Sequence, residues 1–176
     1  MNAEQKPEAK PEAPKVELRD ELLDGLMARF PKAITGIRVQ RPARLYASLR
    51  REDLLEIIGY IKKDLGFDHL SSISGADYAD RFEVVYHLWS YSTRKVLTLK
   101  VPLPKDDPRV QSLTSLWKSA DWYEREAYDM YGIKFEGHPN LTRILLPEDF
   151  EGFPFRKDWK LVENPWYEGK EVPKEE

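Results

Sequence analysis

Prolines divide this chain into a part that can form regular structure and a part that cannot. Five of them interrupt the sequence beyond Phe135: Pro139, Pro147, Pro154, Pro165 and Pro173. Proline lacks the amide hydrogen that helices and strands use, and its ring clashes with a preceding helical turn, so no helix or long strand survives this spacing. The helices and strands of the fold must therefore come from residues before position 136.

The first 17 residues also fall outside the expected core. They are rich in Pro, Glu, Lys and Ala and offer too little apolar surface to offset the entropy lost on ordering. We predict a disordered, charged tail over residues 1–17. The chain of 176 residues is 41% hydrophobic, which suits one sizeable core, so we expect one globular domain over residues 18–135.

Within this domain the apolar spacing alternates between helical and strand patterns. It predicts, in order, a helix over 18–30, strands over 34–39 and 45–49, a helix over 54–65 and strands over 70–73, 82–90 and 96–101. The last three strands are joined by polar segments of hairpin length and should run antiparallel to their neighbours.

Two more helices are expected, over residues 113–118 and 121–131. Asp121 and Glu124 have the spacing of an N-terminal capping box, and Gly132 stands where a helix would end. The resulting fold class is α+β: a single mixed sheet with helices packed on it, followed by an extended C-terminal arm.

The arm, residues 136–176, contains aromatic residues that are seldom left in water: Phe150, Phe153, Phe155, Trp159, Trp166 and Tyr167. We predict that it lies extended over the surface of a partner subunit. The alternative is that it packs on its own domain.

Charge and composition exclude several functions. The net charge of -3 gives no basic footprint for nucleic acid, and with no cysteine the chain cannot hold a thiolate-bound iron–sulfur cluster. No apolar run approaches the roughly 20 residues that cross a bilayer. No secretory signal or nucleotide-binding motif is present either. We therefore expect a soluble chain whose membrane association comes only through a complex.

The segment Glu124-Arg125-Glu126 is the first place to look for chemistry. On a helix, Arg125, Glu126 and Asp129 fall within roughly 100° of one another, and Glu124 lies on a different face. Paired carboxylates can serve acid–base catalysis or a metal site, but no histidine has the required Glu-x-x-His spacing. We favour an ion-pair set in which Arg125 holds Glu126 or Asp129 against another chain.

Two further candidates lie in the arm. His138 stands in a Gly-His-Pro turn, where a structural hydrogen bond is favoured over a redox-linked proton role. Arg156, Lys157 and Asp158 could bind an anion, although the acidic residues nearby favour a salt bridge between chains. We assign no catalytic, cofactor-binding or metal-binding residue.

A composite motif runs from Ala120 to Ile133 (ADWYEREAYDMYGI) and continues with His138-Pro139-Asn140-Leu141, Arg143-Ile144-Leu145-Leu146-Pro147 and Arg156-Lys157-Asp158. It resembles the signature of the 30-kDa subunit, also called the C subunit, of proton-pumping NADH:quinone oxidoreductase, or respiratory complex I. By position, the resemblance places the signature residues at Glu124, Arg125, Glu126, Asp129, His138, Arg143, Arg156, Lys157 and Asp158. The chain departs from the family pattern at Thr142 and at Trp159-Lys160.

The resemblance implies a non-catalytic subunit of the peripheral arm. Such a subunit buttresses the large, D-type protein that forms the quinone site, contacts other peripheral-arm subunits, and so supports electron transfer to quinone coupled to proton translocation. FMN, iron–sulfur clusters and quinone would be bound by those partners and no cofactor by this chain. Its place would be the cytoplasmic face of a bacterial cell membrane.

The resemblance leaves two alternatives. Related subunits occur in ferredoxin- and F420-linked complexes and in membrane-bound hydrogenases. A different class would be a stand-alone enzyme using Glu126 and Asp129 as an acid–base pair.

Overall fold

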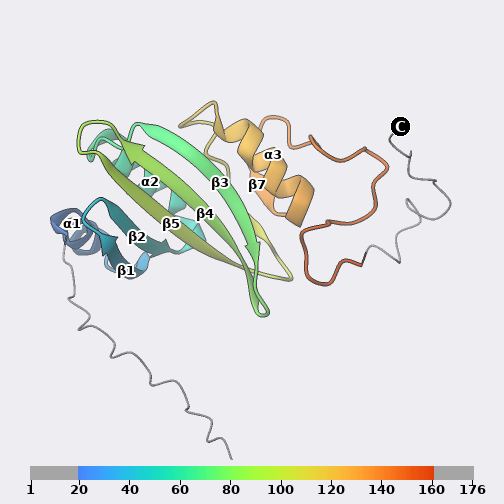
Figure 1. Cartoon of the computed structure of the whole chain (residues 1–176), viewed down its shortest axis with the longest axis horizontal. Coiled ribbons are helices and arrows are strands. Elements are labelled where there is room, and N and C mark those ends of the chain that lie inside the picture. The colour runs from blue at the N-terminus through green and yellow to red at the C-terminus, as the bar shows by residue number, and fades with distance from the viewer. Residues whose placement is uncertain (1–19, 161–176) are drawn as a thin grey trace, which may run out of the picture.

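The computed structural model describes residues 20–160. Its main sheet has five strands in the order β1-β2-β5-β4-β3, and Figure 1 shows α2 behind this sheet and α3 beyond β3. The strands are β1 (Ile34–Arg41), β2 (Arg44–Leu49), β3 (His69–Asp77), β4 (Arg81–Ser90) and β5 (Lys95–Pro104). All neighbouring pairs are antiparallel except β2 with β5, which are parallel. The mixed sheet confirms the predicted α+β class.

The helices bury one apolar stripe each. They are α1 (Glu21–Arg29), α2 (Leu54–Lys63), which follows the short 3-10 turn η1 (Arg51–Asp53), and α3 (Ala120–Tyr131). Leu23 and Leu26 of α1 and Ile57, Ile58 and Ile61 of α2 are at most 1% exposed. They join one core with the inward-facing side chains of the strands, as the helical spacing predicts.

Two expectations about local structure are wrong. Residues 113–118 form turns and no helix: the amides of Leu116 and Trp117 both donate to the Leu113 carbonyl oxygen, which closes a single turn that is not continued. Asp121 and Glu124 form no capping box, because α3 begins at Ala120 and its cap position is Ser119. The ending at Gly132 is confirmed by its left-handed φ of 71°.

A second, two-stranded parallel ladder has no counterpart in the sequence predictions. It pairs β6 (Arg109–Gln111) with β7 (Lys134–Glu136). Val110 and Phe135, which face each other in this ladder, are both buried. The ladder fixes the exit of α3 and starts the arm, which runs on beyond α3 in Figure 1.

Of the arm, the structure describes residues 137–160 beyond β7; the remaining arm residues and the predicted tail lie outside the described residues. This part contains turns and bends and neither helix nor strand, as the prolines require. It lies against its own α3: the rings of Phe153 and Phe155 make edge contacts with Tyr128 and Tyr131. Docking of the arm on a partner stays a prediction.

Candidate functional site

The candidate site is a set of charged residues that joins α3 to the arm, which we call the clamp: Arg125, Asp129, Arg143 and Arg156. Two of these come from α3 and two from the arm. Arg125 and Asp129 point toward the arm because the opposite face of the helix, with Ala120 and Ala127, packs in the core.

Asp129 is the centre of the clamp. Its side chain is fully buried, and Oδ1 accepts from Nη1 of Arg143 at 2.7 Å. Oδ2 accepts from three successive backbone amides, those of Ile144, Leu145 and Leu146, at 3.0, 2.8 and 2.9 Å. This is a nest of amides closed around a carboxylate.

Arg143 ties the clamp to the following loop. Its Nη2 donates to the carbonyl oxygens of Phe150 and Gly152 at 3.0 and 3.1 Å. The guanidinium carbon also lies over the rings of Phe150 and Phe153 at 5.9 and 5.5 Å. One planar cation thus fixes residues 143–153 onto the helix, as the donor geometry of arginine allows.

Arg125 holds the start of the same loop. Its guanidinium donates to the carbonyl oxygens of Thr142 and Arg143 at 3.1 and 3.0 Å. Within the described residues Asp129 pairs with Arg143 and not with Arg125, and Glu126 is exposed. The face predicted for Arg125, Glu126 and Asp129 exists, but the described chain does not join them in an ion-pair set.

Arg156 closes the clamp at the end of the helix. It donates from Nε to the carbonyl oxygen of Tyr131 at 2.6 Å, and its guanidinium lies over the rings of Phe82 and Phe153 at 5.0 and 4.6 Å. A Cβ at Gly132 would lie 2.6 Å from Nη2 of Arg156 and from the Phe153 ring. The glycine therefore serves the close approach as well as the turn.

The next two signature residues turn outward. The side chains of Lys157 and Asp158 belong to exposed residues, while the Lys157 amide donates to Oδ2 of Asp77 at 2.8 Å. Oδ1 of Asp77 lies 2.7 Å from the Lys105 ammonium. Burial opposes ionisation of Asp77, but these donors outweigh it and lower its pKa.

His138 is part of a turn. Its side chain is fully buried, Nδ1 accepts from the Asn140 amide at 3.0 Å, and Nε2 lies 3.3 Å from the carbonyl oxygen of Asp121. Because Nδ1 is an acceptor, Nε2 carries the proton and donates. The geometry is that of a hydrogen-bonded structural histidine.

Glu124 is buried apart from the clamp, as its position on another face predicts. It accepts from the Ser112 hydroxyl and the Leu113 amide, both at 2.6 Å. Burial, reinforced by the nearby Asp121, raises the pKa of Glu124 to about 7. The buried Tyr86 hydroxyl, whose pKa burial and the charge of Glu124 raise, has no hydrogen-bond partner among the described residues.

Asp129 responds to its surroundings in the opposite direction. Burial alone would favour its neutral form, but the amides of Leu146, Leu145 and Ile144 and the Arg143 guanidinium hold its pKa below the ordinary value. The carboxylate is ionised at neutral pH, and its acceptor positions are filled by the arm.

Chemically, the clamp holds a chain segment. Within residues 20–160 no group of three His, Asp or Glu side chains is arranged to hold a metal. Among the same residues, no helix is long and apolar enough to cross a membrane.

Sequence reasoning missed Asp77, Phe82 and Thr142, which the arm or the clamp contacts. Asp77 and Phe82 lie on strands far from the arm in sequence and carry no motif. Thr142 stands out in the sequence only as a departure from a family pattern, yet it supplies a carbonyl and a hydroxyl to Arg125.

The fold and the clamp define a small α+β protein whose charged residues fasten a C-terminal arm to its last helix. Residues 47–165 match the family model described as "Respiratory-chain NADH dehydrogenase, 30 Kd subunit". This range spans the clamp and most of the sheet, and the chain belongs to that family.

Individual relatives agree with this assignment. The chain is 42% identical over 146 residues to the C subunit of the F(420)H(2) dehydrogenase of Methanosarcina mazei, covering 81% of this chain and 92% of the relative. It is 40% identical over 177 residues to the C subunit of the NADH-quinone oxidoreductase of Chloroherpeton thalassium, covering 93% and 72%.

Solved structures share the fold. A trypsin-resistant fragment of Nqo5 superposes with a TM-score of 0.60 at 34% identity, over 68% of this chain and 96% of the fragment. A chain of the membrane-bound sulfane sulfur reductase, an archaeal respiratory membrane complex, superposes with a TM-score of 0.72 at 24% identity, over 81% and 85%.

Proposed function

We propose that this chain is a non-catalytic assembly subunit in the peripheral arm of a membrane-bound NADH:quinone oxidoreductase. It buttresses the large subunit that forms the quinone site, and so supports electron transfer to quinone coupled to proton translocation. The observation that carries the proposal is the clamp, because Arg125, Asp129 and Arg143 are used to shape a segment of chain.

The shaped arm presents apolar side chains outward. Leu145, whose amide belongs to the nest around Asp129, is 63% exposed, and Phe155 is 57% exposed although its ring touches Tyr131. On α3 itself, Trp122 is 62% exposed. Large apolar side chains held rigidly at a surface are suited to anchor a protein interface. We assign this surface to the large quinone-site subunit.

The test is to replace Leu145 and Phe155 by serine in the full chain and to measure the assembled complex in native membranes. Interface anchors contribute about 2 kcal/mol each, or about 30-fold in affinity. We expect the isolated variant to melt close to the wild-type temperature and the amount of intact complex to fall. Quinone reductase activity of the membranes should fall in proportion.

The matched control is Met27→Ser on α1, where the side chain is 37% exposed and α1 lies at the opposite end of the molecule from the arm (Figure 1). It should leave assembly unchanged. If the Leu145 and Phe155 variant assembles as well as the wild type, the arm is not part of the interface. A change in turnover per assembled complex would argue for a direct role in the reaction.

In this proposal FMN, iron–sulfur clusters and quinone belong to partner subunits, and the chain sits at the cytoplasmic face of a bacterial cell membrane, held there by the complex. The stand-alone enzyme with Glu126 and Asp129 as an acid–base pair is disfavoured. Glu126 is exposed and Asp129 is already occupied by the arm.

A second candidate is the equivalent subunit of an F420-linked complex. The match to the Methanosarcina mazei protein, over 92% of its length, favours it as strongly as the quinone oxidoreductase matches favour the first. Membranes from the source organism decide between them: oxidation of NADH supports the first, and oxidation of reduced F420 the second.

A further inference from the structure

The main sheet has one face that no described helix covers. Its inward face meets α1, α2 and α3 through the core, and Figure 1 shows α2 behind the sheet. The opposite face carries half-buried side chains from three adjoining strands: Tyr46 and Ser48 of β2, Lys100 of β5, and Val85, His87 and Trp89 of β4. The pairings of Tyr46 with Thr98 and of Thr98 with His87 place them in one surface.

This open face is basic although the chain as a whole is acidic. Among the described residues of β1, β2, β4 and β5, the face carries five cations against a single carboxylate, Glu83. The cations are Arg38, Arg41, Arg44, Arg81 and Lys100. Glu83 is satisfied by Lys100 at 2.9 Å and lies 3.8 Å from Arg81, and Arg81 also pairs at 2.9 Å with Asp80, which precedes β4. Burial first, then the charges of Arg44 and Lys100, lower the pKa of His87, in keeping with the positive field there.

Arg38, Arg41 and Arg44 are the cations of this face left to bind a partner. All three are exposed, and none has an ion pair or hydrogen bond through its side chain with the described part of the chain (residues 20–160). Unpaired arginines beside half-buried aromatic residues are typical of protein interfaces.

A groove of about 380 Å³ opens on this face between β1 and β5, lined among others by Gly36, Arg38, Tyr46, Ser48 and Lys100. Gly36 leaves space in the groove, since a Cβ built there meets no atom of residues 20–160 within 4 Å. The Tyr46 hydroxyl already donates to Oε1 of Gln40, and the Lys100 ammonium donates one hydrogen bond to Glu83. The Arg38 guanidinium, the Ser48 hydroxyl and the remaining hydrogens of Lys100 are the donors suited to a carboxylate.

We propose that this groove binds a carboxylate-bearing segment of a second partner subunit. The partner is identified by charge complementarity, and the assignment rests on the proposed function to the extent that the partner is a member of the same complex. The arm is not involved, because it lies on α3 at the other side of the molecule (Figure 1).

The first test fills the groove without disturbing the fold. Gly36→Leu places a side chain in open space, so the isolated variant should melt at the wild-type temperature or above. Its co-purification with the membrane complex should fall about tenfold, the change produced by a loss of about 1.4 kcal/mol in binding. The matched control is Gly25→Leu on α1, where a Cβ also meets no described atom within 4 Å. This variant should co-purify normally.

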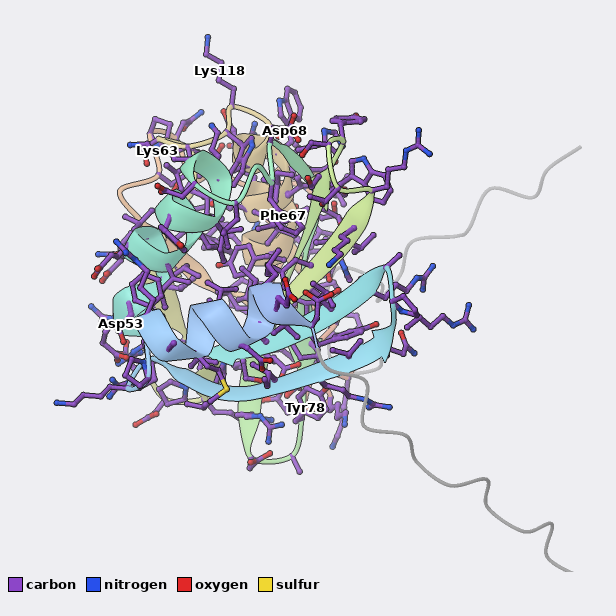
Figure 2. The ribbon with its side chains drawn as sticks, turned by 90° about the vertical axis from the view of Figure 1, so that its left-hand side faces the viewer. Asp53, Lys63, Phe67, Asp68, Tyr78 and Lys118 are labelled. Carbon is purple, nitrogen blue, oxygen red and sulfur yellow. The ribbon has the colours of Figure 1, made fainter. Side chains whose placement is uncertain are left out.

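The second test reverses charge. Arg38→Glu with Arg44→Glu should reduce co-purification at least about tenfold, because like charges across an interface repel strongly. Lys63→Glu with Lys118→Glu makes the same change in net charge. Both lysines are exposed and project from the upper half of the molecule in Figure 2, away from β1 and β2. This control should retain wild-type levels.

The occupant is identified by a zero-length crosslink. Arg38→Lys keeps the charge and supplies an amine that a carbodiimide couples to a neighbouring carboxylate in the purified complex. A crosslink to Asp or Glu of another subunit supports the proposal. A crosslink to residues 1–19 or 161–176 of this chain, or none, overturns it.

The same experiments separate this proposal from the assembly role. If the wild-type chain is absent from the membrane complex, the assembly role and the groove proposal are both wrong. If the wild type is present and the groove variants co-purify equally well, only the groove is wrong and the assembly role stands.

Discussion

Asp129 and Glu124 are buried carboxyl groups on one helix, yet their surroundings drive their pKa values in opposite directions. Among the described residues, four donors surround Asp129, three of them backbone amides and one a guanidinium. From residues 20–160, Glu124 accepts two hydrogen bonds and neither donor is a cation. The nearby carboxylate of Asp121 adds to the penalty of burial. Donor count and donor charge decide which form of a buried acid is stable.

For Glu124 we predict a stability that falls with rising pH. The folded state keeps the proton up to about pH 7, whereas the unfolded chain releases it near the ordinary value of 4.5. Between these values the folded state binds more protons, so the free energy of unfolding decreases as pH rises. Urea melts from pH 4.5 to 8 should show this slope, and Glu124→Gln should flatten it. A slope unchanged in the Gln variant would contradict the assignment.

For Asp129 we predict a large loss of stability on substitution. Asp129→Asn keeps the shape but removes the charge and turns an amide NH2 toward donors, leaving Arg143 without its counter-ion. Breaking a buried pair costs about 3–5 kcal/mol. Denaturant melts at neutral pH give the change, and Glu126→Gln on the same helix, exposed, is the control. A loss near that of the control would mean that the clamp contributes little.

The contribution of Asp129 also has an acid limit. Its pKa is lowered from 3.8 in the folded chain, so its stabilisation is present above pH 3.8. It is lost as pH falls through the lower folded value. The difference in the free energy of unfolding between wild type and Asp129→Asn should therefore become smaller as the pH falls through that range.

At the scale of elements, the end of α3 combines a backbone requirement with a packing requirement. Gly132 adopts φ of 71°, and its missing Cβ admits Phe153 and Arg156. Gly137 adopts φ of 80°, but a Cβ there meets no atom of the described chain within 4 Å. Gly132 therefore meets both the backbone and the packing requirement, whereas Gly137 meets the backbone requirement alone.

We therefore predict that Gly132→Ala destabilises the chain more than Gly137→Ala. Both introduce a left-handed alanine, at a cost on the order of 1–2 kcal/mol, and only the first forces the arm to move. Thermal melts should rank the variants, and hydrogen exchange in residues 142–156 should rise for Gly132→Ala alone. If the two variants lose the same stability, Phe153 and Arg156 move aside for the added Cβ at position 132 without a loss of free energy.

The long strands and α1 to α3 could be predicted because each shows several periods of apolar spacing. The ladder β6–β7 could not, since three residues are too few to show alternation. The segment 113–118 has an apolar spacing but is too short to show a full helical period twice, and it makes one turn closed on the Leu113 carbonyl before α3 begins.

The site was predictable as a set of residues and not as a set of contacts. Asp129 and Arg143 both stand in the quoted motif, but their pairing depends on a loop of irregular backbone whose path no periodicity encodes. The three amides that bind Asp129 carry no side-chain signal at all. The separation of Glu124 from the others is confirmed, because helical geometry alone determines which face it occupies.

At the scale of the whole molecule, the arm is part of the folded unit as well as a surface for partners. A chain stopped after Glu136 loses every described donor to Asp129. We predict that it still unfolds cooperatively but at lower denaturant, with a loss comparable to that of Asp129→Asn. Adding Asp129→Asn to the truncated chain should change its stability little, because the partners are already gone. If the two losses in the free energy of unfolding add, Asp129 does not stabilise the chain through the amides of residues 144–146.

The parallel pairing of β2 with β5 has a consequence for biosynthesis. The chain makes α1, β1, β2, α2, β3 and β4 before the strand that joins β2 to β4 exists, so a nascent chain holds two half-sheets with open edges. Contacts between distant parts of a sequence form slowly, and unpaired strand edges invite aggregation. The sheet can close only when β5 has left the ribosome, and the clamp only when residues 143–146 follow. A chain that ends before β5 therefore leaves the inner edges of β2 and β4 without the strand that joins them.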